Sequence, residues 1–295
     1  MNPTPPSRPT TAQKRREFRK LHDSGCFVIP NPWDIGSALY LQSLGFKALA
    51  STSSGFAWSR GRPDNTPSRD QILEHLAAMA AALDVPLNAD FENGLAADAA
   101  GLAESVRLAV GTGVAGVSIE DSIGPRLAAP GAPLASGAPL ASGAPLFELE
   151  VAVDRIRAAR RAIDAAGGEA LLIGRAECFL VGLPDIELTL TRLKAYAAAG
   201  ADCLYAPGIR SEEHIRRVVE AVHPKPVNLL VSAPGELTLQ RIAELGVRRV
   251  SVGGALARAA WGGFMRAAQQ IAEHGRFDGL AGAASGQTLN ALFGG

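Results

Sequence analysis

The feature that most constrains the fold of this chain is an alternation of short apolar strands with longer helices. The predicted strands lie at residues 27–30, 48–51, 87–90, 116–120, 171–175, 203–206, 227–231 and 249–252. Predicted helices between or beside them include 14–22, 35–44, 149–166, 186–199, 212–222 and 237–245. Strands that alternate with helices predict a parallel sheet. Eight such units predict a closed (β/α)8 barrel, or TIM barrel.

An open, doubly wound α/β sheet is the alternative arrangement of the same elements. Its Gly-x-Gly-x-x-Gly turn would follow the first strand, where this chain has Asn31-Pro-Trp-Asp34 instead. We therefore expect a single barrel domain over residues 13–295. The preceding residues 1–12 are rich in Pro, Ser and Thr and lack the apolar segment of a signal peptide, so we expect a flexible tail.

Composition narrows the classes of partner. The chain has 295 residues, of which 47% are hydrophobic, and its formal net charge is +0. Balanced charge argues against a nucleic-acid partner, and no apolar run is long enough to cross a membrane. The three cysteines form no C-x-x-C pair, which is typical of reduced thiols in the cytoplasm.

Two segments interrupt the alternation. Residues 124–146 contain the phrase Gly-Ala-Pro-Leu three times, a low-complexity composition that cannot form a packed core and predicts a mobile loop. Beyond the last strand, residues 254–293 are predicted to form helices that carry Trp261 and Phe264. Surplus apolar surface there favours packing against another subunit. We therefore expect a homodimer or a homotetramer.

Carboxylates gather where two neighbouring strands end. Asp90 and Glu92 follow the third strand, and Glu120 and Asp121 follow the fourth. Like charges a few ångströms apart repel each other, so such a cluster needs compensation. Mg²⁺ is a hard cation that prefers a few carboxylate oxygens and water, and Mn²⁺ is an alternative. The cluster therefore predicts a metal site at the mouth of the barrel, where such barrels place their chemistry.

The other strand ends supply one cation and a turn rich in hydroxyl groups. Arg175 ends the fifth strand, and residues 51–55 read Ser-Thr-Ser-Ser-Gly after the second. Together with the acids they form a plausible receptor for a small carboxylate that chelates a metal. Neither lysine nor histidine is predicted at a catalytic strand end. Schiff-base aldolase chemistry and a histidine-rich zinc site are therefore not favoured.

Several of these residues also have purely structural interpretations. Arg175 can serve as an ion-pair partner of Glu177, and Asp64 lies in a turn-rich segment where local hydrogen bonding favours aspartate. Trp33 is interpreted either as a lid over the barrel mouth or as a contact to the ligand. Gly253-Gly254 suits close helix packing better than a phosphate cradle. Residues 155–161 are predicted to form a solvated, arginine-rich helix face.

Six motifs, in this order, resemble the isocitrate lyase/phosphoenolpyruvate mutase superfamily. They are Asn31-Pro-Trp-Asp-Ile-Gly-Ser-Ala, Ser51-Thr-Ser-Ser-Gly, Gly61-Arg-Pro-Asp, Asp90-Phe-Glu-Asn-Gly, Gly113-Val-Ala-Gly-Val-Ser-Ile-Glu-Asp and Gly174-Arg-Ala-Glu. The resemblance spans about residues 14 to 275. It implies a (β/α)8 barrel with a helix exchanged between subunits. It also implies chemistry on an α-keto or α-hydroxy carboxylate chelated to Mg²⁺, through a pyruvate-enolate-like species.

The resemblance also implies roles for individual acids. Asp90 corresponds to the residue that binds the metal directly. Glu92 corresponds to the second acid of the family's Asp-x-Asp and is longer by one methylene. Glu120 corresponds to the acid that holds metal-bound water and is assigned to both the metal site and catalysis.

The remaining implied roles concern the substrate. Arg175 corresponds to the arginine that faces the substrate, with binding and catalytic functions. Thr52 and Ser53 correspond to the turn that holds the substrate carboxylate. Asp64 corresponds to the acid of a gating loop and is assigned a catalytic role, while Trp33 is assigned to substrate binding.

The segment after Asp121 departs from both branches of the superfamily. It reads Ser-Ile-Gly-Pro-Arg-Leu-Ala-Ala-Pro and lacks the cysteine of the lyase branch. Arg126 and Ala128 stand near the lysine and asparagine of the mutase and phosphonopyruvate hydrolase branch. We predict a carbon–carbon lyase for a small α-keto or α-hydroxy di- or tricarboxylate. The alternatives are a mutase or hydrolase that acts on a P–C bond and a barrel that binds α-keto acids without catalysis.

Overall fold

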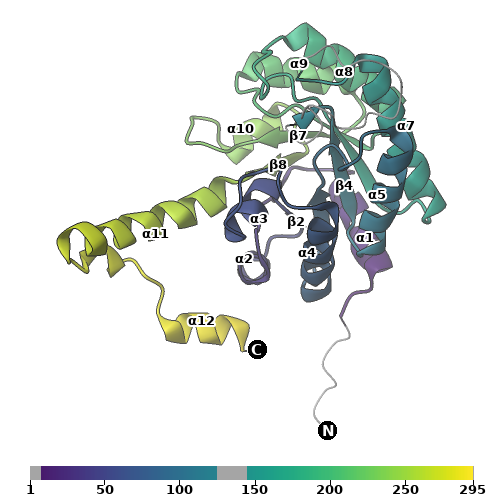
Figure 1. The fold of residues 1–295 in the computed structure, drawn as a ribbon. Coiled ribbons are helices and arrows are strands. Elements are labelled where there is room, and N and C mark those ends of the chain that lie inside the picture. Colours follow the sequence, from purple (N-terminus) through teal and green to yellow (C-terminus); the bar gives the residue numbers. More distant parts are fainter. Residues whose placement is uncertain (1–7, 125–144, 295) are drawn as a thin grey trace.

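The computed structural model describes residues 8–124 and 145–294, and its centre is one sheet of eight parallel strands (Figure 1). The strands are β1 (Phe27–Ile29), β2 (Leu49–Ala50), β3 (Leu87–Asp90), β4 (Gly116–Glu120), β5 (Leu171–Arg175), β6 (Cys203–Tyr205), β7 (Val227–Leu230) and β8 (Arg249–Ser251). Their order is β1-β8-β7-β6-β5-β4-β3-β2. The amide of Ala50 in β2 donates to the carbonyl of Pro30 after β1, at 3.1 Å, and joins the two ends of the sheet. The predicted (β/α)8 barrel is confirmed.

Helices surround this barrel. They are α1 (Thr11–Leu21), α2 (Ile35–Ser43), α3 (Ser53–Ser59), α4 (Arg69–Ala82), α5 (Ala99–Gly111), α7 (Leu149–Ala165), α8 (Ile186–Ala198), α9 (Glu212–Val222) and α10 (Leu239–Glu244). After β8 come α11 (Ala255–His274), the short 3-10 helix η1 (Asp278–Leu280) and α12 (Gly286–Phe293). Both α3 and α4 follow β2, and the short α3 was not expected from the sequence. It begins directly at the Ser-Thr-Ser-Ser-Gly turn, and Thr52 is its N-cap.

Helix α1 packs across the amino-terminal end of the barrel. Phe18 is fully buried there, and a Cβ at Gly116 of β4 would lie 2.8 Å from its ring. Lys14 donates to the carbonyl groups of Ala80 and Leu83 at the end of α4. Helix α1 begins at Thr11, within the stretch that we expected to be a tail. Its position leaves the opposite end of the barrel for chemistry.

Arg155 corrects our interpretation of the arginine-rich face of α7. We predicted that residues 155–161 are solvated, but Arg155 is only 2% exposed. Its guanidinium donates to the carbonyl groups of Asn93 and Ala96 and lies 4.4 Å from the centre of the Phe147 ring. Because its terminal nitrogens donate to these backbone carbonyls, this arginine ties α7 to the loop after β3.

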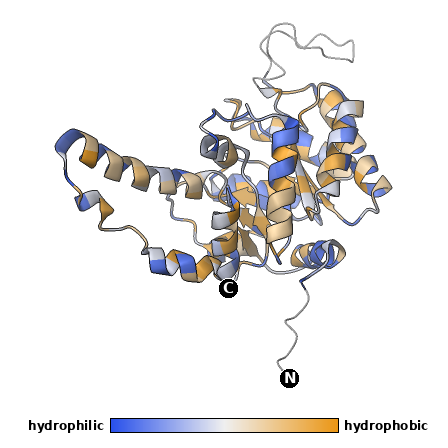
Figure 2. Ribbon diagram, turned by 60° about the horizontal axis from the view of Figure 1, so that its bottom comes forward, coloured by the Kyte–Doolittle hydropathy of each residue, from blue (hydrophilic) through white to orange (hydrophobic). Residues whose placement is uncertain are grey.

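The carboxyl-terminal helices leave the body of the barrel as an arm. Helix α11 projects outward and α12 turns back toward α2 (Figure 1). Apolar residues recur along this arm without a covering layer (Figure 2). Its exposed large hydrophobic side chains are Leu256, Trp261, Phe264, Met265, Ile271, Phe277, Leu280, Leu289 and Phe293. Among the described residues, no helix has the length and apolar character needed to cross a membrane.

The repeat predicted as a loop lies largely outside the described residues, which resume at Pro145. On its two sides, Ser122 and Leu146 form an antiparallel bridge, and the amide of Phe147 donates to the carbonyl of Asp121. The described residues on the two sides of this segment therefore lie beside the carboxyl end of β4.

Candidate active site

A cavity of about 190 Å³ lies at the carboxyl ends of the strands. Its lining includes Asn31, Thr52, Ser53, Asp64, Asp90, Arg175, Tyr205, Arg249, Ser251 and Gly253. These residues come from the ends of six strands and from the loop after α3. Residues far apart in the chain thus converge at the end of the barrel where such folds place catalysis.

Arg175 organises the acidic side of this site. Its guanidinium lies 2.6 Å from Asp90 Oδ1, 3.1 Å from Glu120 Oε2 and 2.9 Å from Glu177 Oε1. The same group lies over the ring of Tyr205, 5.1 Å from its centre. The predicted structural pairing with Glu177 is therefore present, and it coexists with contacts to both predicted metal-site acids.

Three carboxylates surround one guanidinium in this cluster, and burial is the main cause of the shifted pKa values of Glu120 and Glu177. Burial raises the pKa of Glu120, and burial raises that of Glu177 to about 8, although Arg175 opposes both shifts. Burial alone would lower the pKa of Arg175, but the three carboxylates around it raise the value well above normal. Three acids thus share one guanidinium, so the cluster favours the uptake of either a proton or a cation.

The Ser-Thr-Ser-Ser turn connects this cluster to α3. The amide of Ser53 donates to Asp90 Oδ2 at 2.9 Å, and Ser51 Oγ accepts from the amide of Asp90 at the same distance. Thr52 Oγ1 accepts from the amide of Gly55 and caps the helix. At Gly254, a Cβ would lie 2.8 Å from Ser54 Oγ, which agrees with the close-packing interpretation of the glycine pair. The turn therefore has a fixed position against Asp90.

Asp64 also reaches the cavity, although it lies in the loop after α3. Its Oδ1 accepts from the amide of Asn65 at 2.9 Å. Burial, reinforced by the nearby charge of Asp90, raises the pKa of Asp64. A carboxyl group with a raised pKa retains its proton more readily at neutral pH, which suits a proton donor.

Three predicted site residues lie outside the lining of the cavity. One of them, Glu120, still joins the site through its ion pair with Arg175. Glu92 follows β3 with φ of 49° and is buried, and its carbonyl accepts from the amide of Glu120. Trp33 is half-buried before α2, where its amide donates to Ser37 Oγ. The structure thus brings Asp90, Glu120, Arg175, Asp64, Thr52 and Ser53 together, and it places Glu92 and Trp33 beside that group.

Asp121 has a different role from the one its sequence position indicates. Its side chain accepts from the Tyr196 hydroxyl at 2.5 Å, from Arg192 at 3.1 Å and from the amide of Glu177 at 2.8 Å. All these partners lie behind the site, on α8 and just after β5. Asp121 therefore anchors the segment that follows Arg175, while its neighbour Glu120 faces Arg175.

The donor set at the mouth of the barrel fits a hard divalent cation. Within residues 8–124 and 145–294, no group of three or more His, Cys, Asp or Glu side chains is arranged as a complete metal cage. Mg²⁺ needs no such cage, because it takes one or two carboxylates and fills its other positions with water and substrate oxygens. Asp90 and Glu120 supply that number of carboxylates, and the excess of negative charge favours a cation beside them.

Sequence reasoning missed the polar layer below these residues. Arg249, Asn228 and Ser251 point into the barrel, where Asn228 accepts from Arg249 Nε at 2.8 Å and donates to Ser251 Oγ at 2.9 Å. The alternation of Arg249, Val250 and Ser251 along β8 was the available signal, because residues two apart on a strand share a face.

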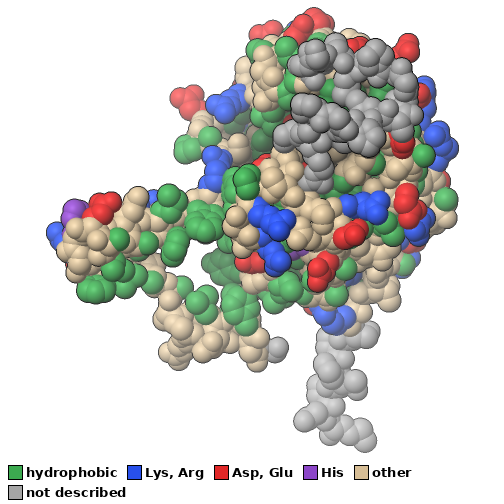
Figure 3. Space-filling model, in the orientation of Figure 1, with side chains coloured by type: hydrophobic (Ala, Val, Ile, Leu, Met, Phe, Trp, Pro, Cys, Tyr) green, Lys and Arg blue, Asp and Glu red, His purple; other side chains and the backbone are tan. Residues whose placement is uncertain are grey.

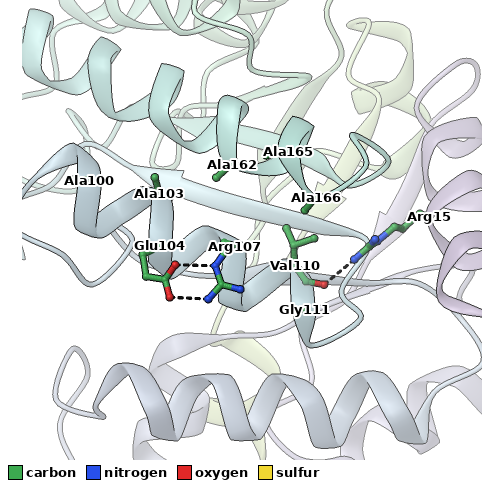
Figure 4. Close-up of a pocket in the computed structure, with 10 residues that line it drawn as sticks. All are labelled: Arg15, Ala100, Ala103, Glu104, Arg107, Val110, Gly111, Ala162, Ala165 and Ala166. Carbon is green, nitrogen blue, oxygen red and sulfur yellow. Dashed lines mark hydrogen bonds and ion pairs between the residues drawn. The ribbon is translucent and has the colours of Figure 1, made fainter.

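A larger hollow of about 730 Å³ lies outside the barrel, between α5 and α7 (Figure 4). Small side chains, mostly alanine, line it. Its charged groups are already engaged, because Glu104 pairs with Arg107 and Arg15 donates to the carbonyl of Val110. This hollow therefore offers no set of groups for catalysis.

Comparisons with known proteins agree with this geometry. The sequence model of the phosphoenolpyruvate phosphomutase family matches residues 18–272. The chain belongs to this family, within the isocitrate lyase/phosphoenolpyruvate mutase superfamily. Our prediction of an enzyme of that superfamily is thereby confirmed.

Individual members of the family support the assignment. An uncharacterised protein of Mycobacterium tuberculosis is 31% identical over 238 residues, which cover 80% of this chain and 81% of that protein. The oxaloacetate decarboxylase of Paraburkholderia xenovorans is 31% identical over 243 residues, with coverage of 81% and 75%. A Burkholderia cenocepacia protein described as a candidate lyase/mutase has a crystal structure with TM-score 0.88 and 42% identity, covering 97% and 98% of the two chains.

Proposed function

We propose that this protein is a cytoplasmic, Mg²⁺-dependent lyase that cleaves a C–C bond of a small α-keto or α-hydroxy di- or tricarboxylate. The bond breaks by retro-aldol cleavage or by decarboxylation, through a pyruvate-enolate-like intermediate. The observation that carries the proposal is the contact of Arg175 with both Asp90 and Glu120, beside the Ser-Thr-Ser-Ser turn. A metal-chelated keto acid and its enolate need this combination of acids, one cation and hydroxyl groups.

Each side chain has a task in this mechanism. Asp90 and Glu120 would hold Mg²⁺, which would supply Lewis-acid activation of the keto or hydroxyl oxygen of the substrate. In decarboxylation of an α-keto acid, Arg175 would stabilise the negative charge that develops on the keto oxygen as the C–C electrons move into the enolate and carbon dioxide leaves. In retro-aldol cleavage the hydroxyl oxygen would give its proton to a neighbouring carboxylate and become a carbonyl, and Arg175 would stabilise the charge on the departing enolate. The hydroxyl groups of Thr52 and Ser53 bind the substrate carboxylate. Asp64, with its raised pKa, gives a proton to the enolate carbon and completes the reaction.

A second candidate is cleavage or rearrangement of a P–C bond. It is favoured by the matching family model, whose description is phosphoenolpyruvate phosphomutase. The residues that would distinguish the two reactions, including Arg126 and Ala128, lie outside the described residues. The similarity to an oxaloacetate decarboxylase supports the C–C reaction as our first choice. A barrel that binds α-keto acids without catalysis stays the third hypothesis.

A substrate panel tests the proposed function. The protein with MgCl₂ is incubated with oxaloacetate, isocitrate, 2-methylisocitrate and phosphonopyruvate, and pyruvate, glyoxylate and phosphate are measured. We expect metal-dependent release of pyruvate or glyoxylate from one of the carboxylates, which EDTA abolishes. If phosphate is released from phosphonopyruvate and no carboxylate is cleaved, the P–C reaction replaces the C–C reaction as the proposed function. If no compound is turned over, the result favours a barrel that binds α-keto acids without catalysis.

We also propose that the arm formed by α11, η1 and α12 packs against a second copy of the chain, in a homodimer or homotetramer. The space-filling view shows hydrophobic side chains along the arm and on the facing side of the barrel body (Figure 3). Phe264 is 62% exposed and Met265 is 51% exposed, which is costly for large apolar side chains in water.

The proposed contact between the arm and a second copy of the chain can be tested by substitution. The double variant Phe264→Glu/Met265→Glu should shift the protein from a dimer or tetramer to a monomer, as measured by light scattering after size exclusion. Gln269→Glu, on the same helix and exposed, is the charge control and should leave the assembly intact. A wild-type protein that is monomeric at all concentrations would exclude this proposal.

A further inference from the structure

The floor of the cavity contains a second arginine, Arg249. It lies in β8, two residues before Ser251, and is paired in register with Phe27 of β1 and Asn228 of β7. It is 2% exposed and lines the same cavity as Asp90 and Arg175. A charged group thus lies below the acidic cluster, within the barrel.

The surroundings of Arg249 contain no negative charge. Its Nε donates to the Asn228 amide oxygen at 2.8 Å, and its NH1 nitrogen lies 3.5 Å from His22 Nε2. No carboxylate among the described residues forms an ion pair with it. Arg175, in contrast, is in contact with three carboxylates. Arg175 therefore has negatively charged partners for its guanidinium, whereas Arg249 has none among the described residues.

Of the titratable groups that act on Arg249, Arg175 is a second cation, and the others are neutral at pH 7. Burial and the charge of Arg249 lower the pKa of His22 to about 3. Burial raises the pKa of Cys203 to about 11 and that of Tyr205 to about 12. A buried cation without a counter-charge is costly, because neutral dipoles replace its hydration only in part. An anionic ligand would supply the missing compensation.

We propose that Arg249 binds a second carboxylate of the substrate, and that the site therefore selects dicarboxylates over monocarboxylates. This inference rests on the proposed function, in which the first carboxylate binds at the mouth beside the Ser-Thr-Ser-Ser turn. The cavity then has a negative rim that takes a metal and a positive floor that takes an anion. A small acid with a carboxylate at each end matches this arrangement, because one carboxylate reaches the metal at the rim and the other reaches Arg249 at the floor.

The experiment compares two ligands that differ only at the distal end. L-Malate carries a carboxylate where 2-hydroxybutyrate carries a methyl group, and both present the same α-hydroxy acid to the metal. Their dissociation constants for the full-length protein with MgCl₂ are measured by titration calorimetry. We expect the wild type to bind malate at least about tenfold more tightly, as for a hydrogen bond between charged groups.

Two variants remove the proposed interaction in different ways. Asn228→Asp keeps the shape of the side chain that holds Arg249 Nε but gives the guanidinium an internal carboxylate partner. Arg249→Met removes the charge. Arg248→Met is the matched control, because Arg248 is the neighbouring residue and donates to the carbonyl of Gly25 away from the cavity. The preference for malate should disappear in the first two variants and persist in the control.

The outcomes separate this inference from the proposed function. The role of Arg249 alone would be overturned if both variants still preferred malate. It would also be overturned if the wild type bound 2-hydroxybutyrate but showed no preference for malate. Equal weakening of both ligands in the variants would make Arg249 a structural residue and also overturn it. If the wild type binds neither ligand with Mg²⁺, the proposed function itself fails together with this inference.

Discussion

Replacing Arg175 with methionine is expected to lower kcat/KM by at least about a thousandfold, the usual consequence of losing a preorganised charge that stabilises a developing anion. The guanidinium is the only cation that contacts the acidic cluster among the described residues. Without it, the oxygen of the enolate would face Asp90 and Glu120 with less compensation. Steady-state kinetics on the substrate found in the panel measure this effect.

The same substitution is expected to lower the free energy of unfolding by about 3–5 kcal/mol, because it leaves carboxylates buried without their partner. Arg175→Lys separates the two effects. Lysine restores the positive charge and part of the stability, but it cannot contact three carboxylates with a planar group, so kcat/KM should stay low. Arg157→Met, at an exposed position that pairs with Asp154, is the control for the loss of an arginine. A lysine variant with wild-type kcat/KM would show that Arg175 is only structural.

The sequence was sufficient for the barrel and for most of the site, because both depend on where strands end. The carboxyl ends of parallel strands meet at one end of a barrel, so Asp90, Glu120 and Arg175 were expected to converge. They do converge, because the guanidinium of Arg175 lies 2.6 Å from Asp90 Oδ1 and 3.1 Å from Glu120 Oε2. Asp64 lies in a loop after α3, and only the resemblance to the superfamily indicated its position.

The features that the sequence did not reveal depend on which way a side chain points. Arg155 and Arg157 both lie in the run on α7, but only Arg155 faces inward and finds backbone carbonyls. Asp121 and Glu120 are adjacent, and adjacent residues of an extended chain point to opposite sides. Arg249 resembles an ordinary charged residue at the start of a strand. Its inward direction and lack of a carboxylate partner became apparent only from the three-dimensional arrangement.

Replacing Asp90 with asparagine is expected to weaken Mg²⁺ binding by at least about tenfold and to lower kcat/KM by about a thousandfold or more. The amide oxygen of asparagine can still accept from the amide of Ser53, so the turn should keep its position. The lost charge is the one that holds the metal in the proposed mechanism. Titration of Mn²⁺ followed by electron paramagnetic resonance measures metal binding independently of turnover.

The matched control for this variant is Asp98→Asn. Asp98 caps α5 by accepting from the amide of Gly101, and asparagine is an equally good cap, so both metal affinity and stability should stay unchanged. Glu92→Gln adds a second comparison, because Glu92 is a predicted metal ligand that does not line the cavity. If Glu92 only holds a metal-bound water or supports the loop, its loss should weaken Mn²⁺ binding less than the loss of Asp90. Unchanged Mn²⁺ affinity in Asp90→Asn would refute the metal site, because no other acid is both at the end of β3 and in the cavity lining.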